Sequence, residues 1–128
     1  MSVATAPSAG ADAAPGFEYL RRTSLEHEAA ALLRGQGFEI FRTDGRQPGV
    51  SLIALRDGEF RFVCVRRRRH PAGTVRAVAE AYAEDLGELR RYRSATIAAE
   101  LWIWCSGDGW RRFTVYPGGL QETTEPGS

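Results

Sequence analysis

The chain has 128 residues, which is typical of one domain and long enough to bury a core without metal or disulfide cross-links. The formal net charge is +1, so overall charge does not predict a nucleic-acid ligand. No apolar run approaches the roughly 18 residues that span a bilayer, and the N-terminus lacks a signal-peptide pattern. Two cysteines, Cys64 and Cys105, lie in apolar strand-like runs. These features predict a cytoplasmic protein with reduced thiols and no membrane partner.

All 17 basic residues are arginine. A GC-rich genome explains that bias without any function. The absence of lysine still excludes Schiff-base catalysis and lysine-assisted phosphoryl transfer.

Composition divides the chain into three parts. Residues 1–16 are mostly small residues and proline, which predicts a disordered N-terminal tail. Residues 17–118 carry the periodic apolar patterns and predict one folded domain. Residues 119–128 predict a flexible C-terminal tail.

The first half of the domain predicts a helix and three strands. Residues 23–26 fit a capping box, and the following leucines and alanines have helical spacing up to Gly35 and Gly37. Residues 17–22 either extend this helix backwards or form a separate turn. Strands are expected over residues 38–41, 50–55 and 60–67, with a loop over residues 44–49. The pair Asp57-Gly58 predicts a two-residue hairpin, which makes the second and third strands antiparallel.

The second half predicts one long helix and two strands. Thr74 can cap a helix whose apolar stripe continues to Leu89, with a close packing contact expected at Gly87. Strands follow over residues 101–105 and 110–116. The order α-β-β-β-α-β-β predicts an α/β fold with a mixed sheet covered by helices.

Strand alternation brings candidate functional residues together. Cys64 and Arg66 share one face of the third strand, and Ser51 lies on the neighbouring antiparallel strand. We therefore expect Ser51 near Cys64 and Arg66, where the run Arg66 to Arg69 begins.

The arrangement resembles the PD-(D/E)xK nuclease superfamily, and most closely the archaeal Holliday junction resolvases and their restriction-endonuclease relatives. Glu26 precedes Gly37 with the family's spacing, and the strand segments 50–54 and 63–66 fall where the family has its Asp and Glu-x-Lys motifs. Gly109-Trp110 opens a strand as a late Gly-Trp does there. The resemblance implies a restriction-endonuclease-like mixed sheet and dimerisation.

The catalytic residue types differ from those of the family. Ser51 stands at the aspartate position, Cys64 at the second carboxylate and Arg66 at the lysine, so only Glu26 keeps its type. The family holds Mg²⁺ with carboxylate oxygens, whereas a serine and a thiol are poor ligands for it and an arginine cannot accept a proton. We expect no intact catalytic set, no metal and no cofactor. Glu26 is interpreted equally as a remnant of a metal site or as a helix cap.

The arginine run has two interpretations. It is either a solvated strand end or a phosphate-binding patch that consists of Arg42, Arg46, Arg66, Arg67, Arg68 and Arg69. The patch predicts a catalytically degenerate nuclease-fold protein that binds DNA or another nucleic acid. One alternative is a non-enzymatic interaction module that forms homodimers. Another is a residual endonuclease that uses Glu26 and Asp44 with Mg²⁺ or Mn²⁺.

Three tryptophans are the remaining candidates. Trp102 and Trp104 share one strand face, and a hairpin would bring Trp110 beside them. They could stack on unpaired bases, but a face packed beneath a helix or a partner subunit is the favoured interpretation.

Overall fold

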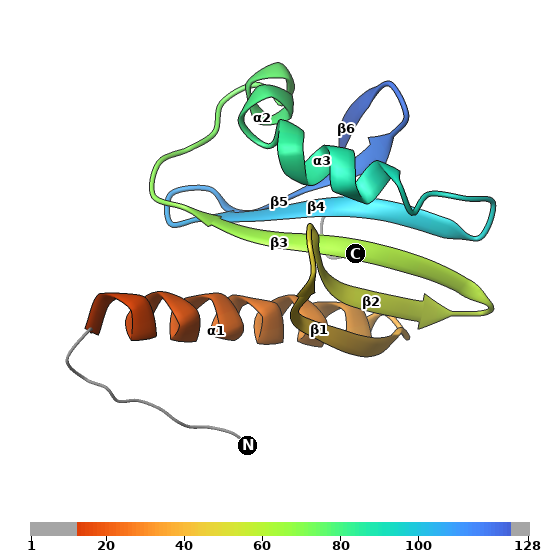
Figure 1. The fold of residues 1–128 in the computed structure, drawn as a ribbon, viewed down its shortest axis with the longest axis horizontal. Helices are drawn as coiled ribbons and strands as arrows, with labels where there is room; N and C mark the ends of the chain where they lie inside the picture. Colours follow the sequence, from red (N-terminus) through yellow and green to blue (C-terminus); the bar gives the residue numbers. More distant parts are fainter. Residues whose placement is uncertain (1–12, 124–128) are drawn as a thin grey trace.

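A single mixed sheet forms the centre of the protein (Figure 1). The computed structural model describes the backbone of residues 13–123 and the side chains of residues 24–123. The elements in chain order are α1 (Ala13–Gly35), β1 (Glu39–Gln47), β2 (Val50–Arg56), β3 (Glu59–Arg68), α2 (Val75–Ala81), α3 (Ala83–Arg90), β4 (Ile97–Cys105), β5 (Gly109–Tyr116) and β6 (Gly119–Thr123).

The six strands lie in the sheet in their sequence order. All neighbours pair antiparallel except β3 and β4, which pair parallel from Phe60 opposite Ile97 to Arg68 opposite Cys105. A parallel pair requires a crossover, and α2 and α3 provide it. The predicted mixed α/β sheet is confirmed.

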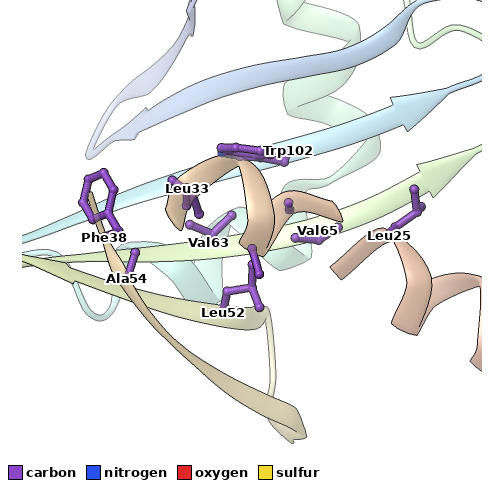
Figure 2. Close-up of a cluster of buried hydrophobic side chains, with 10 residues drawn as sticks. Leu25, Leu33, Phe38, Leu52, Ala54, Val63, Val65 and Trp102 are labelled. Carbon is purple, nitrogen blue, oxygen red and sulfur yellow. The ribbon is translucent and has the colours of Figure 1, made fainter. Parts of the chain in front are cut away.

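Helices cover the two faces of the sheet (Figure 1). α1 packs on β1, β2 and β3, while α2 and α3 pack on the opposite face. Figure 2 shows the core beneath α1, where Leu25 and Leu33 lie over Leu52, Val63 and Val65 of the sheet. The second core includes Cys64 and the apolar residues of β4, β5 and α3. Because both faces of β3 are buried, its middle reads as a continuous apolar run in the sequence.

Several local predictions are confirmed. Asp57 and Gly58 both have positive φ, at 55° and 78°, as a two-residue hairpin requires. The Thr74 side chain accepts a hydrogen bond from the Ala77 backbone N–H at 3.1 Å and so caps α2. α1 ends at Gly35, and Gly37 follows with a φ of 95°.

The predicted limits of the domain are wrong at both ends. α1 begins at Ala13, so residues 23–26 lie inside the helix and do not form a capping box. Helix therefore replaces the predicted tail over residues 13–16, while the predicted disorder of residues 1–12 lies outside the described residues. At the other end, residues 119–123 form β6 and pair with β5, where a flexible tail was predicted. The free edge of β5 offers the hydrogen bonds that order this short polar strand.

The internal boundaries also differ from prediction. The expected long helix is divided at Tyr82, whose φ and ψ are −113° and 27°. Gly87 has no atom within 4 Å of the position a Cβ would take, so the expected close contact there is wrong. β1 continues to Gln47, where a loop was predicted. It contains a bulge at Asp44 and Gly45, whose φ values are 55° and 80°. Such residues are typical of turns as well as of bulges, and so the sequence predicted a loop. None of the described helices is long and apolar enough to cross a membrane.

Candidate functional site

A pocket of about 290 Å³ opens where α1, the β1–β2 hairpin and the end of β3 meet. Its wall contains three of the four family-equivalent positions, namely Glu26, Ser51 and Arg66. The remaining lining residues are Arg42, Asp44, Gly45, Gln47, Pro48, Gly49 and Val50. α1, β2 and β3 thus place Glu26, Ser51 and Arg66 around one concavity, although the fourth position, Cys64, does not line it.

The β1–β2 hairpin forms the outer wall and is held by α3 and the segment that follows. Gly49 has a φ of 74°, and a Cβ built on it would lie 2.7 Å from the Glu88 Cβ. The Gln47 side-chain amide donates a hydrogen bond of 2.8 Å to the Tyr92 hydroxyl. These contacts fix the hairpin over the pocket, and only glycine suits the close approach at position 49.

The carboxylate of Glu26 is neutralised by an arginine. Arg42 Nη2 donates to Glu26 Oε1 at 3.1 Å and lies 3.8 Å from Asp44 Oδ1. The same guanidinium donates through Nη1 to His27 Nε2 at 3.0 Å. Glu26 is 8 % exposed and lies in the interior of α1, so it does not cap the helix. Arg42 therefore occupies the space between the two carboxylates that a residual metal site would use.

The hydroxyl of Ser51 serves the backbone. The Val65 N–H donates to Ser51 Oγ at 3.0 Å, and Ser51 is only 6 % exposed. This bond continues the β2–β3 contact beyond the end of the ladder, where Leu52 lies opposite Val63. The serine oxygen therefore takes part in a hydrogen bond that joins β2 to β3.

Cys64 is a core thiol. Its exposed fraction is 0 %, and it belongs to the core beneath α2 and α3. Burial raises the pKa of Cys64 to about 12, against the opposing effect of nearby Arg66. A neutral, buried thiol is neither a nucleophile at neutral pH nor a ligand for Mg²⁺.

Arg66 is held on the side of the pocket next to α3. Its Nε and Nη2 donate to the two carboxylate oxygens of Asp85 at 3.0 and 2.8 Å, and Nη1 donates to the Val65 carbonyl at 3.0 Å. Burial is the largest single influence and lowers the pKa of Arg66. The hydrogen bonds to Asp85, together with electrostatic interactions with Cys64, Asp85 and Tyr82, outweigh it, so the pKa is raised. The guanidinium is therefore a permanent cation with an assigned partner.

Asp85 is the residue that sequence reasoning missed. Tyr82, Asp85 and Leu89 follow at i, i+3 and i+7, a spacing that places them on one side of a helix. Leu89 is buried against the sheet. The helical spacing therefore indicated that Asp85 faces the sheet. It pointed to a functional residue only if a partner for Arg66 was being sought.

Strand alternation divides the arginine run. Arg66 contacts α3, and Arg68 lies on the same side, with its guanidinium 5.8 Å from the Tyr82 ring centroid and its Nε donating to the His70 carbonyl. Arg67 is exposed and points to the opposite face of β3, and Arg69 is exposed beyond the strand end. Arg46 is exposed in the hairpin. The six predicted arginines therefore do not form one patch. Arg42, Arg66 and Arg68 contact other residues of the protein, whereas Arg46, Arg67 and Arg69 are exposed.

The tryptophans meet as strand pairing predicted. Trp104 lies opposite Trp110, and the Trp110 ring centroid is 5.6 Å from that of Trp104 and 5.5 Å from that of Trp102. Trp102 is fully buried in the core beneath α1, while the other two rings are half-buried.

Mg²⁺, which the family uses, does not fit the residues of the pocket. Among the described residues no group of three or more His, Cys, Asp or Glu side chains is placed to hold a metal ion. The one pair of carboxylates in the wall, Glu26 and Asp44, shares Arg42. A divalent cation there would have to displace that guanidinium.

The fold is similar to that of a known nuclease. Hjc, a Holliday junction resolvase from the archaeal hyperthermophile Archaeoglobus fulgidus, superimposes with a TM-score of 0.57 at 17% sequence identity, over 84% of this chain and 86% of Hjc. No protein-family model matches the sequence. No curated protein matches it significantly either. The chain thus shares the fold of this resolvase, the restriction-endonuclease-like mixed sheet that the sequence resemblance implied.

Proposed function

Because the chain has the fold of a Holliday junction resolvase, we propose that it is a nuclease-fold protein that binds nucleic acid without cleaving it. The observation that carries the proposal is the bidentate pair of Arg66 with Asp85 at the pocket wall. Arg66 stands at the family's lysine position, and a permanently protonated group cannot take a proton from water.

The other positions support the loss of cleavage. Metal-assisted hydrolysis of phosphodiesters needs oxygen ligands that hold a cation and polarise the phosphate. Here Ser51 accepts a backbone N–H, Cys64 is buried and neutral, and Glu26 is paired with Arg42. The side chains at all three positions are thus engaged in contacts within the protein.

The free arginines support phosphate binding. Arg46, Arg67 and Arg69 are exposed, and none of them forms an ion pair with another side chain within residues 24–123. A guanidinium fork can bind two phosphate oxygens at once and needs no metal to do so. Arg42 and Arg66 shape the pocket, whereas the exposed arginines are the proposed phosphate contacts.

Binding is tested by fluorescence anisotropy with a labelled duplex and a four-way junction over a range of salt. The double variant Arg67→Ala/Arg69→Ala is expected to bind more weakly and to lower the slope of log K against log salt by about 1.8, if each arginine neutralises one phosphate. The matched control is Arg34→Ala/Arg76→Ala, which removes two exposed arginines elsewhere. Equal affinity in the parent and in the Arg67/Arg69 variant would refute phosphate binding at this place.

Cleavage is tested separately, with linear, nicked and four-way DNA incubated with Mg²⁺ or Mn²⁺. We expect intact DNA. Reproducible cleavage that disappears in Glu26→Gln would overturn the proposal and favour the residual endonuclease with Glu26 and Asp44.

Homodimer formation is a second proposal, supported by an exposed aromatic residue on an edge strand. Phe41 of β1 is 52 % exposed, and β1 has a free edge within the described residues. Light scattering after size exclusion should then show a dimer in the parent and a monomer in Phe41→Ser. A parent that stays monomeric at high concentration would dismiss this second role.

A further inference from the structure

The face of the sheet on the α1 side carries a second set of aromatic and cationic residues. α1 packs on β1 to β3, and α2 and α3 lie on the opposite face, so no described helix packs on β5 and β6 from this side (Figure 1). Strand alternation places the following residues of the last three strands on this face: Glu100, Trp102, Trp104, Trp110, Arg112, Thr114, Tyr116, Gln121 and Thr123.

Trp104 and Trp110 form the aromatic part of this face. Their rings meet edge to face at an interplanar angle of 67°, and both are half-buried. Trp102 beneath them is fully buried. Its ring makes a second edge-to-face contact with Trp110, at an interplanar angle of 70°. The two outer indoles are thus fixed on paired strands, packed against the core beneath α1 but only partly buried. A stacking platform needs such rigidly held aromatic residues that solvent still reaches.

The charge of this face suits an anion. Arg67 of β3 is the register partner of Trp104, so an exposed guanidinium lies beside the aromatic pair. Among the face positions of β4 to β6 named above, the only carboxylate is Glu100. It is 7 % exposed and contacts Arg61 at 3.2 Å, Arg112 at 3.7 Å and Trp102 Nε1 at 2.7 Å. Its charge is therefore satisfied within the protein and does not repel an anionic ligand.

The neighbouring positions are polar, which argues against an apolar protein partner. Thr114, Gln121 and Thr123 continue the same face of β5 and β6 beyond Arg112. The centre of a stable protein interface is depleted in such residues and enriched in large apolar ones. A ligand with flat rings and a charged backbone matches the combination better.

We propose that this face binds an unpaired strand of nucleic acid, with bases stacked on Trp104 and Trp110 and a phosphate at Arg67. The inference rests on the proposed function, because Arg67 serves both. It adds that the preferred ligand contains a single-stranded segment next to a duplex or branch.

The test compares labelled oligo-dT, a blunt duplex and a duplex with a single-stranded tail, bound to the full chain. Trp110→Leu is expected to weaken binding of oligo-dT and of the tailed duplex at least about fivefold, and to leave the blunt duplex unchanged. Trp110→Phe keeps a ring and should restore most of the affinity. The matched control is Tyr116→Leu, which removes an exposed aromatic ring from the same face of β5 at a distant position.

A second variant guards against a folding defect at Trp110. Thr123→Glu adds a carboxylate opposite Arg112 without removing a core side chain, and it should weaken oligo-dT binding while the melting temperature stays near that of the parent. Oligo-dT binding that is unchanged in both folded variants, or lowered equally by Tyr116→Leu, would overturn the inference. A dimer that Trp110→Leu dissociates would overturn it as well.

The outcomes for the parent separate the two proposals. Binding to the duplex without binding to oligo-dT removes the stacking face and keeps the proposed function. Binding to neither ligand removes both.

Discussion

Arg66 of β3 and Asp85 of α3 form a bidentate ion pair at 2.8 and 3.0 Å that joins the pocket to the crossover helix. Their side chains are 30% and 22% exposed, so the pair is largely shielded from water. It ties the position where the resembled nucleases have lysine to helix α3 of the crossover. The contribution of this ion pair can be measured as a change in the free energy of unfolding.

Replacement of Asp85 by asparagine should destabilise the protein by about 1–3 kcal/mol, because the change keeps the size of the side chain but leaves the Arg66 charge partly buried without its counter-charge. Urea unfolding measures the difference. The control is Glu80→Gln, which breaks the exposed pair with Arg76 and should change stability by less than about 0.5 kcal/mol. Similar effects of the two variants would show that the Arg66 pair contributes no more than a surface contact.

The closeness of the hairpin to α3 predicts an asymmetry between two glycines. Gly49→Ala places a Cβ 2.7 Å from the Glu88 Cβ and 3.3 Å from the Asp85 carbonyl oxygen, at a positive φ. Gly45→Ala meets nothing within 4 Å and differs only by backbone strain. We expect a loss of about 1 kcal/mol for Gly45→Ala and about 2–4 kcal/mol for Gly49→Ala. Thermal unfolding of both variants measures the two losses. A larger loss of stability for Gly45→Ala than for Gly49→Ala would contradict the prediction.

Burial of Cys64 predicts a loss of stability in alkali. Burial raises the pKa of this thiol from 9.0 to about 12, so above pH 9 the unfolded chain releases a proton that the folded chain keeps. The free energy of unfolding is therefore unaffected by this group below pH 9 and falls by up to about 1.4 kcal/mol per pH unit above it. The parent and Cys64→Ala are compared by urea unfolding from pH 8 to pH 10.5. Parallel pH profiles would contradict the assignment, because every other titrating group is common to both proteins.

Restoration of the family residues tests whether the four positions are equivalent to those of the nucleases. The triple variant Ser51→Asp, Cys64→Glu and Arg66→Lys returns two oxygen ligands and a smaller cation next to Glu26. We expect Mn²⁺ binding that calorimetry detects in the triple variant and not in the parent. Addition of Glu26→Gln should weaken it. A correctly folded triple variant with no affinity for Mn²⁺ would argue that the resemblance does not extend to the site.

Local patterns predicted the strand core of the sheet better than its limits. The Asp57-Gly58 turn and the apolar alternation of β2, β3, β4 and β5 depend on nearby residues, and the structure agrees with them. The start of β6 depends on the free edge of β5, which the residues of β6 do not themselves encode. No sequence pattern marked the start of α1 at Ala13. Gly45 is a similar case, since a bulge within paired strands and a loop use the same residue types.

The sequence predicted that certain residues lie near one another, but it did not predict the residues with which they pair. Alternation and the family spacing placed Glu26, Ser51 and Arg66 together, and all three line one pocket. Their partners were not predicted, because Asp85 lies within the crossover in α3 and Arg42 was predicted to contact phosphate. Sequence adjacency also overstated the arginine run as one surface, since consecutive residues of a strand point to opposite faces.

The parallel pairing of β3 with β4 extends through Arg68, so β4 fixes the backbone of the arginine run beyond Val63, where the ladder with β2 ends. Guanidiniums on one face of a strand therefore originate from points that are about 7 Å apart and cannot be re-spaced. Only side-chain rotamers, at about 2 kcal/mol per arginine, remain to be ordered when an anion binds. A flexible phosphate chain bound as proposed would therefore have to match this fixed spacing.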